Sequence, residues 1–125
     1  MDMQAVALLK SGARFRVTGN NLLVRPDPEP KQVGLIQLPD GACDGVVNTG
    51  VVLARGYVMS KAAFHTPIPG ILKGNRIAFV RFLAKQDSNV QLSERLGDSV
   101  IRIRAADVLL VFDDEDLPLI RPDLV

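Results

Sequence analysis

The sequence predicts an all-β domain folded as a sandwich or a barrel, and three observations predict it. The apolar runs are short, the segments between them are rich in glycine and proline, and no 3.6-residue period is sustained after residue 11. A length of 125 residues suits one domain, and 47% apolar with 23% charged residues is typical of a globular chain. A chain of this size can bury one core.

The strands are predicted from short apolar or alternating runs that end at turn-forming residues. The run at 76–82 has arginines near its ends and an apolar middle, and 51–54 is rich in valine, which favours strands. Residues 22–25 form a strand that stops at Pro26, because proline cannot donate to a sheet ladder. The predicted strands cover residues 15–17, 22–25, 51–54, 76–82, 90–92, 100–104 and 107–112.

The remaining segments are predicted mainly from their glycine and proline residues. Residues 56–74 contain five such residues and are predicted as a long loop or an imperfect hairpin, and 94–98 as a turn. Residues 2–10 are predicted as a short amphipathic helix that ends at Ser11-Gly12, since glycine suits the position after a helix. A helix this short needs a surface on which to pack.

Residues 26–41 form an unusual loop. Proline at every second position at its start predicts an extended, solvated segment at 26–31, yet Leu35, Ile36 and Leu38 follow. Large apolar side chains are costly to leave in water, so they either cover the domain's own core or anchor another protein. In an extended segment, Ile36 and Leu38 share one face and Gln37 points to the other.

The composition excludes several classes of function. A net charge of +1 lacks the basic surplus of a nucleic-acid-binding protein, and an aromatic content of 5% with no tryptophan argues against a base-stacking surface. One cysteine excludes an internal disulfide, and one histidine excludes a two-histidine metal centre. No apolar run approaches a membrane span, and an acidic residue stands where a leader peptide needs a basic one. We therefore expect a cytoplasmic protein with no membrane or nucleic-acid partner.

Few residues suggest catalytic or metal chemistry. His65 has no acidic residue within five positions and Cys43 has no base beside it, so an ordinary loop residue is the simpler interpretation of each. The acidic run at 113–116 could bind a divalent cation, but such runs are more often solvated or paired with a basic side chain. The glycines at 70–74 lack the Lys-Ser/Thr of a phosphate-binding loop. No catalytic residue, metal or cofactor is predicted.

The order of these features resembles the co-chaperonin (GroES) family from residue 15 to about 113. Five blocks carry the resemblance, in the family's order and spacing. They are LLVR at 22–25, KQVGLIQLP at 31–39, GVVLARG at 50–56, LKGNRIAF at 72–79 and IRIRAADVLLV at 101–111. The second block is similar to the family's mobile-loop motif, K-x-x-G-G-I-x-L-P.

The resemblance implies an irregular β-barrel over residues 14–113, with a long mobile loop at about 26–41 and short extensions at 1–13 and 114–125. It implies a homo-oligomeric ring, usually of seven subunits, that caps an ATP-driven chaperonin and encloses its folding clients. The loop would dock on the chaperonin's apical domains through a set of five residues. These residues are Gly34, Leu35, Ile36, Gln37 and Leu38. Because ATP hydrolysis belongs to the partner, the resemblance implies that this chain is not an enzyme.

The chain departs from the family pattern at a few positions. Leu35 stands where the family usually has glycine, Gln37 where it usually has an apolar residue, and Asn75 where it usually has aspartate. These departures suit a divergent copy, for example one encoded by a virus. A second hypothesis is a GroES-like structural or virion assembly protein that does not take part in a chaperonin cycle. Zinc alcohol dehydrogenases contain a similar barrel, but this chain lacks their Cys and His ligands.

Overall fold

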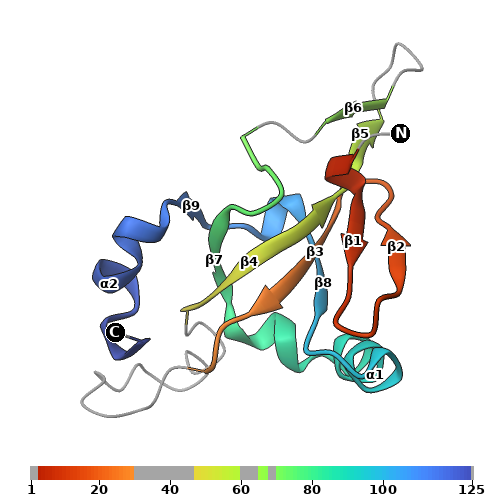
Figure 1. Cartoon of the computed structure of the whole chain (residues 1–125). Helices are drawn as coiled ribbons and strands as arrows, with labels where there is room; N and C mark the ends of the chain where they lie inside the picture. The colour runs from red at the N-terminus through yellow and green to blue at the C-terminus, as the bar shows by residue number, and fades with distance from the viewer. Residues whose placement is uncertain (1–2, 30–46, 60–64, 68–69, 125) are drawn as a thin grey trace.

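The computed structural model describes residues 3–29, 47–59, 65–67 and 70–124. An antiparallel five-stranded sheet forms its centre (Figure 1). In spatial order its strands are β8 (Ile101–Arg104), β3 (Asn21–Pro26), β4 (Val47–Arg55), β7 (Arg76–Val80) and β9 (Leu110–Phe112). Two antiparallel hairpins accompany the sheet: β1 (Val6–Leu8) with β2 (Arg14–Arg16), and β5 (Tyr57–Met59) with β6 (His65–Pro67).

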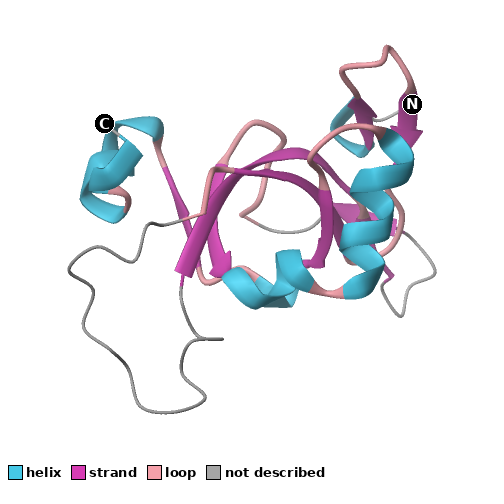
Figure 2. Ribbon diagram, turned by 90° about the horizontal axis from the view of Figure 1, so that it is seen from below, coloured by secondary structure: helices cyan, strands magenta, loops and turns pink. Residues whose placement is uncertain are grey.

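The helical segments are short and lie mostly in the second half of the chain. The α-helices are α1 (Asp87–Leu96) and α2 (Leu117–Ile120). The 3-10 helices are η1 (Met3–Ala5), η3 (Arg81–Lys85), η4 (Ala105–Asp107), η5 (Asp114–Asp116) and η6 (Pro122–Leu124). Figure 2 shows the curved sheet between α1 on one side and the C-terminal segment, residues 113–124 with η5, α2 and η6, on the other.

The predicted β-rich fold is confirmed, but the sheet does not close into a barrel. In the described part of the chain, β8 and β9 stand at opposite edges of the five-stranded sheet and do not pair with each other. The strands predicted at 22–25 and 51–54 are present, and the second is longer than predicted. The segment 56–74, predicted as a loop or an imperfect hairpin, contains the hairpin of β5 and β6.

The two central strands, β3 and β4, bury apolar side chains on both of their faces. Leu23 pairs with Ala54 and Val24 with Val52, so the register skips Leu53. This irregularity keeps both faces apolar, and each face contributes to its own core cluster. The first cluster contains Leu22, Val24, Val52, Ile71, Ile77, Phe79, Ile101 and Ile103. The second contains Ala7, Leu9, Leu23, Ala54 and Val100.

The predicted N-terminal helix over residues 2–10 is wrong. Of the described residues 3–10, only η1 is helical, and β1 follows it. Ala5, Ala7 and Leu9 are all buried, and a spacing of two residues is the pattern of a strand with one face on the core. Pairing with β2 and packing on the second core cluster therefore select a strand for a sequence that also suited a short helix.

The strand predicted at residues 90–92 is also wrong, because this segment belongs to α1. Leu92 and Leu96 lie four residues apart and pack on the second core cluster, as on one face of a helix. Gly97 ends the helix with a φ of 62°, in the left-handed region that favours glycine. Asn89 is buried, and its side chain exchanges hydrogen bonds with the backbone of Arg102, which ties α1 to β8.

Asp98 connects the turn after α1 to the rest of the domain. Its side chain is 1% exposed, and Oδ2 accepts hydrogen bonds from Nη2 of Arg25 at 2.8 Å and from the backbone N–H of Lys10 at 3.1 Å. Burial alone would raise the pKa of this carboxyl. The two donors outweigh burial and hold the pKa of Asp98 below its ordinary value of 3.8.

Replacing Asp98 with asparagine is expected to lower the free energy of unfolding at neutral pH by roughly 1–3 kcal/mol, because a charged hydrogen bond is lost. Since the folded pKa is depressed, the carboxylate's contribution is complete well above pH 3.8. It is lost as the pH falls below this value through the folded pKa. The stabilities of the wild type and the Asp98→Asn variant should therefore converge in acid. Denaturant unfolding at a series of pH values measures this, and a difference that stays constant with pH would contradict it.

Candidate partner-docking site

The residues predicted to dock on a partner, Gly34, Leu35, Ile36, Gln37 and Leu38, lie outside the described residues. Cys43 lies outside them as well. The structure does describe the chain on both sides of this segment. We call residues 26–29 and 47–50 the stem, because through them the chain leaves β3 and returns in β4.

The two halves of the stem are hydrogen-bonded to each other. Pro26 is the register partner of Gly50, and the backbone N–H of Asp27 donates to the carbonyl oxygen of Thr49 at 2.8 Å. Glycine is required at position 50, because a Cβ there would lie 2.8 Å from the carbonyl oxygen of Arg25. The segment that carries the predicted docking residues therefore starts and ends on adjacent strands.

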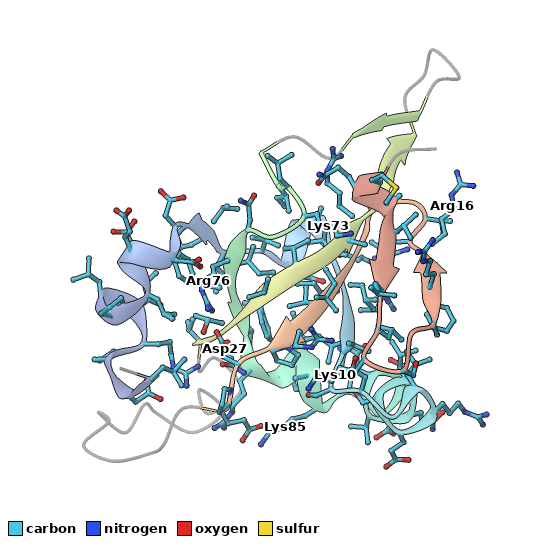
Figure 3. All side chains as sticks on the ribbon, viewed as in Figure 1. Lys10, Arg16, Asp27, Lys73, Arg76 and Lys85 are labelled. Carbon is cyan, nitrogen blue, oxygen red and sulfur yellow. The ribbon has the colours of Figure 1, made fainter. Side chains whose placement is uncertain are left out.

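Charged side chains reinforce the stem on the side of the C-terminal segment. Oδ2 of Asp27 accepts a hydrogen bond from Oγ1 of Thr49 at 2.7 Å and pairs with Nη1 of Arg76 at 3.1 Å. Nε of Arg76 also donates to Oδ1 of Asp114 at 2.6 Å. Figure 3 shows Asp27 and Arg76 facing each other between the sheet and the C-terminal segment.

These contacts bear on two sequence-based interpretations. In the segment 26–31, which the sequence predicts to be solvated, residues 28 and 29 are exposed, and 30–31 lie outside the described residues. Asp27 is the exception, because its side chain bridges β4 and β7 and is only 17% exposed. For the acidic run at 113–116, the pairing with a basic neighbour is confirmed at Asp114. In the part of the chain that the structure describes, no group of three or more His, Cys, Asp or Glu residues could hold a metal ion.

A third group at the stem, Arg121, was not singled out from the sequence. It follows α2, is 3% exposed, and donates to the carbonyl oxygen of Pro28 and to Oδ1 of Asn48. Its signal in the sequence was weak. It is the only basic residue after residue 104, and it stands in a tail of acidic and apolar residues. Such a cation suggests an internal partner, but the sequence does not indicate which one.

A cavity of about 360 Å³ opens beside the stem. Its lining residues are Pro26, Asp27, Pro28, Glu29, Asn48, Ala84, Ser93, Ser99 and Ile101. Both of its carboxylates are paired, Asp27 with Arg76 and Glu29 with Lys85, and the Ser93 hydroxyl donates to the Val100 carbonyl oxygen. These three groups are thus engaged in contacts within the domain.

The remaining sequence-predicted candidate, His65, lies in β6 opposite Met59. It therefore belongs to a hairpin strand. Among the described residues, no helix is both long and apolar enough to cross a bilayer. Comparison with known proteins identifies no family, since no family model and no curated protein matches the chain.

Asp27→Asn is expected to lower the free energy of unfolding by roughly 1–3 kcal/mol, because the variant weakens a hydrogen-bonded ion pair with Arg76 that is largely shielded from solvent. Glu29→Gln provides the matched control two residues away. Glu29 pairs with Lys85 at 3.5 Å and both side chains are about half exposed, so its loss should cost less than about 1 kcal/mol. Denaturant unfolding compares the two variants, and equal losses would contradict a special role for Asp27.

Proposed function

We propose that this chain is a co-chaperonin of the GroES type, a ring-shaped lid that docks on an ATP-driven chaperonin through Ile36 and Leu38. The stem is the observation that carries the proposal. The segment whose sequence resembles the family's docking loop begins and ends on two adjacent strands, β3 and β4, which are hydrogen-bonded to each other. A rigid base suits docking, because less of the chain then has to be ordered when the partner binds.

The energetics favour many weak contacts. Ile36 and Leu38 would each contribute roughly 1.5–3 kcal/mol if fully buried in a partner. Ordering the backbone costs about 1–2 kcal/mol per residue, so a single loop binds weakly. Copies linked in a ring bind more tightly, because after the first contact the others are intramolecular. Weak individual contacts also let the lid leave when the chaperonin changes conformation.

Two exposed strand edges support assembly into a ring. β9 pairs with β7 on one side only, within the described residues, and Leu109, Leu110 and Val111 are exposed there. β2 pairs with β1 alone among the described strands, and all three of its residues are exposed. A strand edge presents a row of unpaired backbone N–H and C=O groups, and these favour pairing with another chain.

The two edges are complementary in charge and lie on opposite sides of the molecule (Figure 1). β2 carries Arg14 and Arg16, whereas the acidic run at 113–116 follows β9 directly. Pairing β9 of one copy with β2 of the next is a head-to-tail contact. Repeated contacts of this kind produce a ring when the rotation closes. We propose the family's usual seven copies for this ring.

Ile36→Asp is expected to weaken retention of the chain by a chaperonin in the presence of adenine nucleotide, since a charge cannot enter an apolar groove without a large desolvation cost. Gln37→Asp is the matched control, because in an extended segment position 37 faces away from positions 36 and 38, and binding should largely persist. A pulldown with the full-length variants measures both. Equal retention of both variants, or no retention of the wild type, contradicts the proposal. Recovery of the chain in stoichiometric amounts within virus particles would instead support the structural alternative.

Leu110→Asp is expected to reduce the native mass of the protein to that of a monomer, because it introduces a charge into the proposed β9 edge contact. Leu119→Asp is the control for the same chemical change at an exposed leucine outside this edge. The two side chains belong to residues that are 54% and 83% exposed, so neither change should disturb the core. Native mass spectrometry measures the assembly. A monomeric wild type, or a Leu110→Asp variant with an unchanged native mass, would contradict the proposed contact between β9 of one copy and β2 of the next.

A further inference from the structure

We infer that the C-terminal segment, residues 113–124, positions the docking loop by clamping its stem, and that Arg121 is the central residue of this clamp. The consequence for docking rests on the proposed function. The clamp itself depends only on contacts within this chain.

One guanidinium joins both halves of the stem. Nη2 of Arg121 donates to the carbonyl oxygen of Pro28 at 2.6 Å, in the half of the stem that follows β3. Nη1 donates to Oδ1 of Asn48 at 2.7 Å and to Oγ1 of Thr49 at 3.4 Å, on the strand that returns. The planar fork of arginine holds several acceptors in fixed directions, which a lysine ammonium cannot do.

The buried charge of Arg121 is compensated within the same segment. Its Nε and Nη2 donate to the two carboxylate oxygens of Asp123, each at 2.8 Å. A buried cation is costly unless it is paired and hydrogen-bonded, and this bidentate pair meets both conditions. The C-terminal segment thus supplies both the clamping group and its counter-ion.

A second contact attaches the same segment to the stem. Asp114, at the start of η5, accepts a hydrogen bond from Arg76, which in turn pairs with Asp27. Asn48 and Thr49, which Arg121 contacts, are themselves almost fully buried. The C-terminal segment therefore contacts the stem in two ways, directly through Arg121 and indirectly through Arg76. Figure 1 shows this segment beside the end of the sheet at which β3 ends and β4 begins.

The clamp holds the stem in one orientation relative to the sheet. Strand ends without such contacts open by local unfolding at a small free-energy cost. A stem that is held in place before binding reduces the ordering cost of docking, and so raises affinity without any new contact to the partner. The C-terminal segment then has a specific role in docking.

Amide hydrogen exchange on the free, full-length chain tests the clamp. Arg121→Met is expected to speed exchange at Asp27 and Thr49 at least about tenfold, because charged hydrogen bonds to the stem are lost. Exchange at Ala105, whose N–H donates to Asn20 at the other end of β3, should not change. Arg102→Met is the matched control, since this exposed arginine of β8 donates to Asn21 at 3.4 Å, far from the stem.

Arg121→Lys serves as a second variant if the methionine variant does not fold. It keeps the positive charge but loses the planar guanidinium that donates several hydrogen bonds. It is expected to loosen the same two stem amides, by less than the methionine variant. Unchanged exchange at Asp27 and Thr49 in a folded variant overturns the clamp. An equal acceleration at Ala105 also overturns it, because the effect is then a general loss of stability.

Binding to a chaperonin with adenine nucleotide tests the positioning role. The Kd of Arg121→Met for the chaperonin is expected to be at least about tenfold higher than that of the Arg102→Met control. A looser stem with an unchanged Kd overturns the positioning role. If the wild type itself does not bind, the proposed function fails, while the exchange experiment still decides whether the clamp exists.

Discussion

The pairing of β3 with β4 is the constraint on which the rest of the structure depends. Both strands are buried on both faces, so their register decides which side chains enter each core cluster. The skip at Leu53 allows Val24 and Val52 to face one cluster while Leu23 and Ala54 face the other. Because each cluster also includes residues of other strands, a shift in this register would misplace much of the core.

The same pairing brings the two ends of the predicted docking segment together. Beyond Pro26 the apolar core ends, and polar contacts replace it: Asp27 with Thr49 and Arg76, and Arg121 with Pro28 and Asn48. Buried polar contacts of this kind require a specific geometry, since each donor and acceptor must find its partner. Such contacts suit the stem, because they fix the direction in which the chain leaves the sheet, and burial of apolar area alone does not.

Different parts of the fold were predictable to different degrees. The strand at 22–25 was clear, because an apolar run ends at Pro26. The strand at 90–92 was wrongly predicted, since three alternating residues do not distinguish a strand from one face of a helix. There the deciding signals were Leu92 and Leu96 at helical spacing and Gly97 as the helix end. At the N-terminus, the buried spacing of Ala5, Ala7 and Leu9 became evident only from the packing against the second core cluster.

The sequence by itself determined the β-rich class, most of the strand positions and the segment proposed to dock on a partner, because apolar patterning and turn residues act locally. Only the tertiary structure decided that the five-stranded sheet stays open among the described strands and that the C-terminal segment packs against the stem. The hydrogen bonds of Arg121 to Pro28 and Asn48 join residues that are far apart in the sequence. Those of Asp98 with Lys10 and Arg25 join residues at a similar sequence separation. Contacts between residues so far apart in the chain leave no local pattern, since their energy depends on the folded geometry.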